Sequence, residues 1–184
     1  MIDGPFLWYL NRGSGAVTLV LFTTTLVLGV LSLGGLPARR LPRFVLQSLH
    51  RNAAALAFAL LGVHIVSAVA DEFVDIRWWH ALVPYGAAYE PLWLGVGTVA
   101  TDLILAVLVT TVVRARLGLA AWVRVHQLAY LAWALGLVHG LMIGTDRGET
   151  WALVVYSASA AVVVVAVLMR VASANALHPE GEPA

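Results

Sequence analysis

Four histidines lie inside long apolar stretches of this sequence, in two pairs with nearly equal spacing. His50 and His64 lie at the ends of the stretch LHRNAAALAFALLGVH, and His126 and His139 lie at the ends of VHQLAYLAWALGLVH. An ionisable side chain in the hydrocarbon layer of a membrane is costly unless it serves a partner, a cavity or a ligand. Imidazole is a common metal ligand and a common axial ligand of haem iron. The pattern therefore predicts metal chemistry carried by histidine.

The composition indicates an all-α integral membrane protein. Hydrophobic residues make up 61% of the chain and charged residues only 11%, which is far outside the range of soluble domains. The sequence contains no cysteine, which excludes disulfides, iron–sulfur clusters and thiolate ligation of haem. The basic residues are all arginine, a usage associated with GC-rich bacterial genomes.

Five apolar stretches have about the length that a membrane-spanning helix needs. They cover residues 13–35, 44–70, 91–113, 120–143 and 151–171. We therefore expect an extracytoplasmic amino-terminal segment at 1–12, a bundle of about five transmembrane helices at 13–171, and a cytoplasmic tail at 172–184.

The charges between these stretches predict the orientation in the membrane. Arginines gather in the connections after the first and third stretches, at Arg39, Arg40, Arg43, Arg114 and Arg116, whereas the other connections are mostly acidic. The positive-inside rule then places the amino terminus outside and the carboxyl terminus in the cytoplasm of a bacterial plasma membrane.

This topology predicts which histidines share an iron atom. The second and fourth stretches run in the same direction, so His50 and His126 lie at an inner depth and His64 and His139 at an outer depth. The prediction is two stacked b-type haems, with Arg51 and Arg124 as further cofactor-binding residues that reach propionates. A spacing of 13 residues does not keep His126 and His139 on one face of a straight helix. We expect either a distortion near Gly136 and Gly140, or haems approached from flanking directions.

With its paired histidines at spacings of 14 and 13, the chain resembles the ferric reductase-like transmembrane family, over approximately residues 13–171. That family includes the membrane part of the NADPH oxidases and the iron reductases of yeast. The resemblance implies that the four histidines are axial ligands of two haem b groups. Larger members of the family have six helices, whereas five are expected here, and the flavin would lie on a separate partner. Superoxide-producing relatives carry a further histidine where this chain has Ala68.

The predicted function is electron transfer across the membrane by a bis-histidine dihaem cytochrome b, as the membrane module of a metalloreductase-like oxidoreductase. The expected partners are the lipid bilayer, a cytoplasmic-side donor that is a flavoprotein or a quinol, and an outer-face acceptor; no nucleic acid and no separate catalytic residue are expected. The alternatives are a quinol-linked cytochrome b subunit and a haem-free helical membrane anchor. We expect His80 to be an interfacial residue and His178 to be solvated. Asp102 is either a structural carboxylate paired with Thr98 or Thr101, or a proton-handling group.

Overall fold

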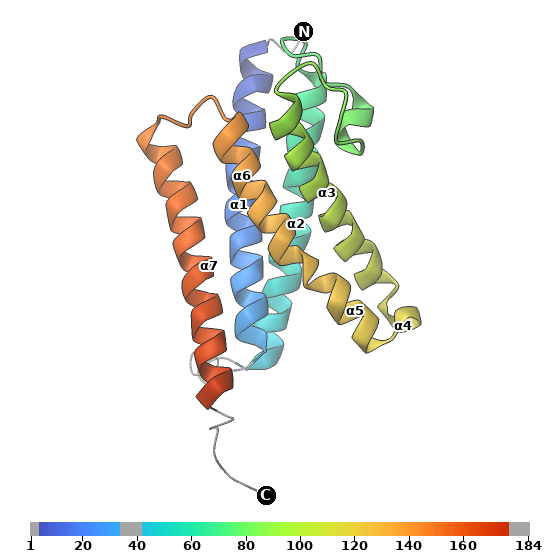
Figure 1. Cartoon of the computed structure of the whole chain (residues 1–184), viewed down its shortest axis with the longest axis vertical. Coiled ribbons are helices and arrows are strands. Elements are labelled where there is room, and N and C mark those ends of the chain that lie inside the picture. The colour runs from blue at the N-terminus through green and yellow to red at the C-terminus, as the bar shows by residue number, and fades with distance from the viewer. Residues whose placement is uncertain (1–3, 34–41, 177–184) are drawn as a thin grey trace, which may run out of the picture.

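The computed structural model describes residues 4–33 and 42–176, which form helices and connecting loops with no strand among them (Figure 1). Within these residues, five helical segments are long and apolar enough to cross a membrane. They are α1 (Gly4–Ser32), α2 (Arg43–Ala70), α3 (Pro91–Val112), α5 (Leu119–His126) together with α6 (Leu128–Ile143), and α7 (Thr150–Ala176). Two shorter elements, η2 (Trp78–Ala81) and α4 (Arg114–Leu117), lie in the connections. The predicted all-helical fold with five candidate spans is confirmed.

The first and last helices are longer than the hydropathy pattern indicates. Helix α1 begins at Gly4, so most of the segment expected at 1–12 belongs to this helix. Pro5 suits the first turn because backbone N–H groups there have no acceptor within the helix, so the N–H that proline lacks is not needed. The residues after Pro5 are mostly apolar. Helix α7 continues to Ala176, past the expected end at 171. Arg39, Arg40 and His178 lie outside the described residues.

The bundle has two ends of different charge. We call one the arginine-rich end, at the bottom of Figure 1, where the described basic residues are Arg43, Arg51, Arg114, Arg116, Arg124 and Arg170. We call the other the acidic end, where the helix ends and loops carry Asp71, Asp75, Glu90, Asp146 and Glu149. The charge asymmetry of the sequence therefore corresponds to two opposite ends of the bundle.

Two helical hairpins form the centre of the bundle. Helix α1 packs along α2, and α3 packs along α6, whereas α2 and α6, which carry three of the four histidines, make little direct contact with each other. Helix α7 packs against α1 through Leu26, Val30, Val163 and Ala166. Trp133 on α6 donates a hydrogen bond from Nε1 to Thr23 Oγ1 on α1 at 2.9 Å, which ties the two hairpins together. The separation of α2 from α6 leaves room between the helices that carry the histidines.

The fourth span is interrupted directly after His126. Helix α5 ends at His126, Gln127 is a turn residue, and α6 begins at Leu128. The distortion expected near Gly136 and Gly140 is therefore misplaced, because α6 runs through both glycines without a break. Gly140 instead provides room for the ring of Tyr156 on α7, whose hydroxyl would lie 2.7 Å from a Cβ at this position. The interruption at Gln127 lies between His126 and His139, and Gln127 itself keeps right-handed helical backbone angles, φ −66° and ψ −19°.

Candidate functional site

The structure places the four histidine rings in the two pairs that the topology predicts. The centroids of the His50 and His126 rings lie 6.1 Å apart with an angle of 55° between the ring planes. The centroids of the His64 and His139 rings lie 6.4 Å apart with an angle of 85°. The first pair lies toward the arginine-rich end and the second toward the acidic end. Each pair joins α2 to the span formed by α5 and α6.

Both separations suit two imidazoles on opposite sides of one metal ion. A metal-bound imidazole nitrogen lies about 2 Å from the metal, and the ring centroid lies about 1 Å further back, so opposed rings have centroids about 6 Å apart. Among the described residues there is no cluster of three or more histidine, aspartate or glutamate side chains that could hold a bare metal ion. Two axial imidazoles suffice only where a macrocycle supplies the other ligands. The residues present therefore fit haem better than a bare ion.

Hydrogen bonds fix the tautomer of three of the four histidines. Nδ1 of His50, His64 and His139 lies 2.8, 2.9 and 2.7 Å from a backbone carbonyl oxygen, that of Thr25, Asn11 and Trp93 respectively. A carbonyl oxygen only accepts, so Nδ1 is the protonated donor in each ring and Nε2 carries the lone pair. Such an outer hydrogen bond is the usual support of a metal-binding histidine. In these three side chains Nδ1 is already used by the protein, so Nε2 is the nitrogen available to a metal.

A glycine lies four residues after each of these carbonyl groups. Gly15 follows Asn11, Gly29 follows Thr25, and Gly97 follows Trp93. We call each such pair a carbonyl–glycine socket. A Cβ at Gly15 would lie 2.9 Å from the His64 ring, one at Gly29 would lie 3.3 Å from the His50 ring, and one at Gly97 would collide with His139. The glycines therefore let each ring approach the backbone of the neighbouring helix closely enough to reach the carbonyl oxygen.

The two sockets on α1 match the two histidines on α2. Asn11 and Gly15 recur as Thr25 and Gly29 after 14 residues, the same interval that separates His50 from His64. Because α1 and α2 run antiparallel, the earlier socket on α1 meets the later histidine on α2. The 14-residue interval between Gly15 and Gly29 is visible in the sequence and could have indicated the two sockets. It lies on α1, however, which carries no histidine, and the histidine pattern concerns only the second and fourth spans.

A cavity of about 310 Å³ lies beside the His64–His139 pair. Its volume falls in the range of cofactor and ligand pockets, roughly 300–1,000 Å³. Helices α1, α2, α3 and α6 all contribute to its lining, which includes Ala68. The space beside this pair is thus of a size that a small-molecule ligand could occupy.

His80, which was expected to be an interfacial residue, lies on η2 in the loop between α2 and α3. Its side chain is only 5% exposed and lines the same cavity. Its Nδ1 accepts a hydrogen bond from the Arg77 backbone N–H at 3.0 Å, and its own carbonyl accepts one from Thr98 Oγ1 at 2.6 Å. Because Nδ1 is the acceptor, Nε2 carries the proton. His80 is therefore a hydrogen-bond donor at the cavity and lacks the free Nε2 lone pair of the paired histidines.

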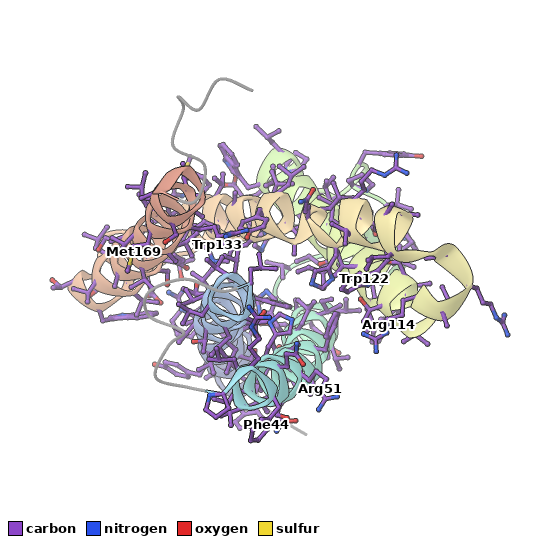
Figure 2. All side chains as sticks on the ribbon, turned by 90° about the horizontal axis from the view of Figure 1, so that it is seen from below. Phe44, Arg51, Arg114, Trp122, Trp133 and Met169 are labelled. Carbon is purple, nitrogen blue, oxygen red and sulfur yellow. The ribbon has the colours of Figure 1, made fainter. Side chains whose placement is uncertain are left out.

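The remaining candidate residues are not joined to the histidine pairs by the described contacts. Arg51 and Arg124 are exposed and bond within their own helices, to Ser48 Oγ and the Ala120 carbonyl, both at 3.3 Å. Figure 2 shows Arg51 and Arg114 near the arginine-rich end, seen from below. Asp102 is not paired with Thr98 or Thr101, because both hydroxyls donate to backbone carbonyl oxygens. The expectation that Asp102 pairs with either threonine is wrong.

Arg12 links α1 to the loop after α6 at the acidic end, an interaction that hydropathy did not indicate. It forms an ion pair with Asp146 in the loop after α6, and its guanidinium lies 4.4 Å from the ring centroid of Trp8. Both partners of the ion pair line the cavity and are largely shielded from solvent, with side-chain exposures of 15% and 21%. The pair therefore ties α1 to α6 beside the cavity.

We expect Arg12→Ala to lower the free energy of unfolding by about 1–3 kcal/mol, because Asp146 then loses its hydrogen-bonded partner in a shielded position. Thermal unfolding of the purified protein in detergent measures the effect. Arg77→Ala is the matched control, since the Arg77–Asp75 pair is more than half exposed and such pairs contribute little. Equal melting temperatures for the two variants would contradict the role assigned to Arg12.

Comparison of the chain with protein-family models, with curated proteins and with solved structures finds no match. The functional evidence is therefore the geometry of the site itself: two opposed imidazole pairs, three rings fixed by carbonyl–glycine sockets, and a cavity beside one pair.

Proposed function

We propose that the chain is a dihaem cytochrome b that transfers single electrons across a membrane. His50 with His126, and His64 with His139, would each hold one haem b. The observation that carries the proposal is the separation of the ring centroids in both pairs, 6.1 and 6.4 Å, which suits two axial ligands of one iron. The resemblance to ferric reductase-like membrane domains points to the same cofactor and the same four residues.

The chain's residues determine the chemistry that this site allows. Bound haem iron would supply one-electron exchange between its ferric and ferrous forms. A histidine on each axial side leaves no open coordination position, so the site favours electron transfer over binding of a substrate at the metal. In the neutral rings of His50, His64 and His139 the sockets hold the proton on Nδ1, so the lone pair is on Nε2, on the side away from the helix that holds Nδ1. The histidine side chains thus need little rearrangement to act as ligands.

The charge at the two ends favours one orientation. We place the arginine-rich end in the cytoplasm of a bacterial plasma membrane, and the acidic end with the amino terminus outside. The His50–His126 pair then lies in the inner leaflet and the His64–His139 pair in the outer leaflet. An electron would enter from a cytoplasmic-side donor and leave to an acceptor at the outer face.

Electron transfer across a sealed membrane tests this function directly. In vesicles that contain the purified protein and enclosed ferricyanide, dithionite added outside should bleach the ferricyanide much faster than in protein-free vesicles. Vesicles with His64→Ala should lose this acceleration because one of the two sites is missing. A wild-type rate no faster than that of empty vesicles would overturn the proposed function.

The arginine-rich end suggests how the donor docks. Arg114 and Arg116 are exposed on the short helix α4, next to the end of α3. A basic surface of this kind accelerates encounters with an acidic partner, and such acceleration falls with ionic strength. We expect the double variant Arg114→Gln and Arg116→Gln to slow reduction by a flavoprotein donor at low salt, with an unchanged haem spectrum. Stopped-flow spectroscopy measures the rate. Reduction that is indifferent to both salt and substitution would instead favour a quinol that arrives through the lipid.

A further inference from the structure

His126 is the one paired histidine whose Nδ1 has no partner among the described residues. Its Nδ1 is buried and makes no hydrogen bond, whereas Nδ1 of His50, His64 and His139 each bonds to a carbonyl oxygen. The ring of His126 packs against Trp122, with the centroids 4.9 Å apart and the planes 32° from parallel. Stacking, rather than a hydrogen bond, therefore holds this ring.

The neighbouring helix shows why the bond is missing. On α3, the socket for His139 consists of the Trp93 carbonyl and Gly97; the positions 14 residues further along, toward His126, are Val107 and Thr111. A threonine thus stands where the other sockets have glycine. Its hydroxyl donates to the Val107 carbonyl oxygen at 2.7 Å, and it accepts a hydrogen bond from Trp122 Nε1 at 3.3 Å. Thr111 thus donates the shorter of two side-chain hydrogen bonds to the Val107 carbonyl oxygen, the other coming from Thr110 Oγ1 at 3.2 Å.

This difference bears on how easily each site is reduced. A hydrogen bond from Nδ1–H to a carbonyl oxygen makes imidazole a stronger electron donor, which stabilises the ferric form. Both histidines of the His64–His139 pair have this bond, but only one histidine of the His50–His126 pair does. The arginines at the end of the bundle toward which the His50–His126 pair lies act in the same sense, because positive charge favours the form with the additional electron.

We propose that Thr111 is a positioning residue that withholds the Val107 carbonyl from His126 and so makes the His50–His126 haem the easier of the two to reduce. The inference rests on the proposed function, since it concerns haem held by these histidines. Its consequence is a defined entry site: an electron from a donor at the arginine-rich end would occupy the His50–His126 haem first.

A redox titration of purified wild type and Thr111→Gly tests this proposal. The wild type should show two midpoint potentials, and Thr111→Gly should lower the higher one and leave the lower one in place. The low-spin ferric electron paramagnetic resonance signal of one haem should shift, because the Nδ1 of His126 then bonds to Val107. Thr24→Gly is the matched control: Thr24 also donates to a carbonyl within its own helix, but it is exposed on α1. It should leave both potentials unchanged.

Two further substitutions keep the test decisive if Thr111→Gly does not retain haem. Thr111→Ala removes the shorter hydroxyl bond to the Val107 carbonyl and leaves the longer one from Thr110, so it should lower the same potential by a smaller amount. Thr111→Ser keeps the hydroxyl and should behave as the wild type. Unchanged potentials in a haem-loaded Thr111→Gly or Thr111→Ala protein would overturn the role of Thr111. A wild-type protein without haem would instead overturn the proposed function itself.

Discussion

His64→Ala and His139→Ala should each remove the same haem and reduce the haem content of the purified protein by about half. Each change deletes one histidine of a single pair, and one imidazole does not replace the other because the two rings lie on different helices with their centroids 6.4 Å apart. The His50–His126 pair is held by other residues of the same helices, so its haem should remain. A pyridine haemochrome measurement, divided by protein concentration, gives the content.

His80→Ala is the control for this result. His80 lines the same cavity, but its Nδ1 accepts a hydrogen bond from the backbone of Arg77, so the ring lacks the tautomer that His50, His64 and His139 share. Both haems should remain in His80→Ala. Loss of a haem in His80→Ala but not in His64→Ala would show that the ligands have been assigned to the wrong residues.

Alanine at the three socket glycines should weaken haem binding in a graded order. Gly97→Ala should have the largest effect, because its Cβ would collide with the His139 ring and push it out of line with His64. Gly15→Ala should have a smaller effect, since its Cβ would lie 2.9 Å from the His64 ring, and Gly29→Ala the smallest, at 3.3 Å from the His50 ring. Haem content and the two midpoint potentials measure the order.

Gly62→Ala provides the matched control for the socket series. Gly62 lies on α2 between the two histidines of that helix, yet a Cβ there would have open space around it. This variant should keep both haems, because alanine is otherwise a better helix former than glycine. If all four alanine variants lost haem equally, a general effect on helix packing would explain the result better than the sockets do.

The parts of the structure that the sequence could predict depend on patterns within single helices. Hydropathy found the five candidate spans, because apolar length is a property of each segment alone. The pairing of His50 with His126 and of His64 with His139 followed from the order and direction of the spans. Ring contacts in the structure have the same pairing.

Other features depend on contacts between helices, which a single segment does not reveal. Helix α1 begins at Gly4 and therefore includes Arg12, which forms an ion pair with Asp146, a residue far away in the sequence. A distortion of the fourth span was expected near Gly136 and Gly140, as one of two ways to accommodate the 13-residue spacing. In the structure the interruption is at Gln127, while Gly136 has open space beside it and Gly140 lies against the Tyr156 ring. His80 is buried because the loop between α2 and α3 folds back onto Thr98.

The measurement that tests the central claim most directly is the difference spectrum of the purified wild-type protein, dithionite-reduced minus oxidised, together with its pyridine haemochrome content. Two opposed histidine pairs predict a six-coordinate b-type spectrum with a Soret band and two haems per chain. A protein that is folded and helical, expressed in cells supplied with haem, but shows no Soret band would contradict the claim and leave a helical membrane protein whose paired histidines serve another purpose.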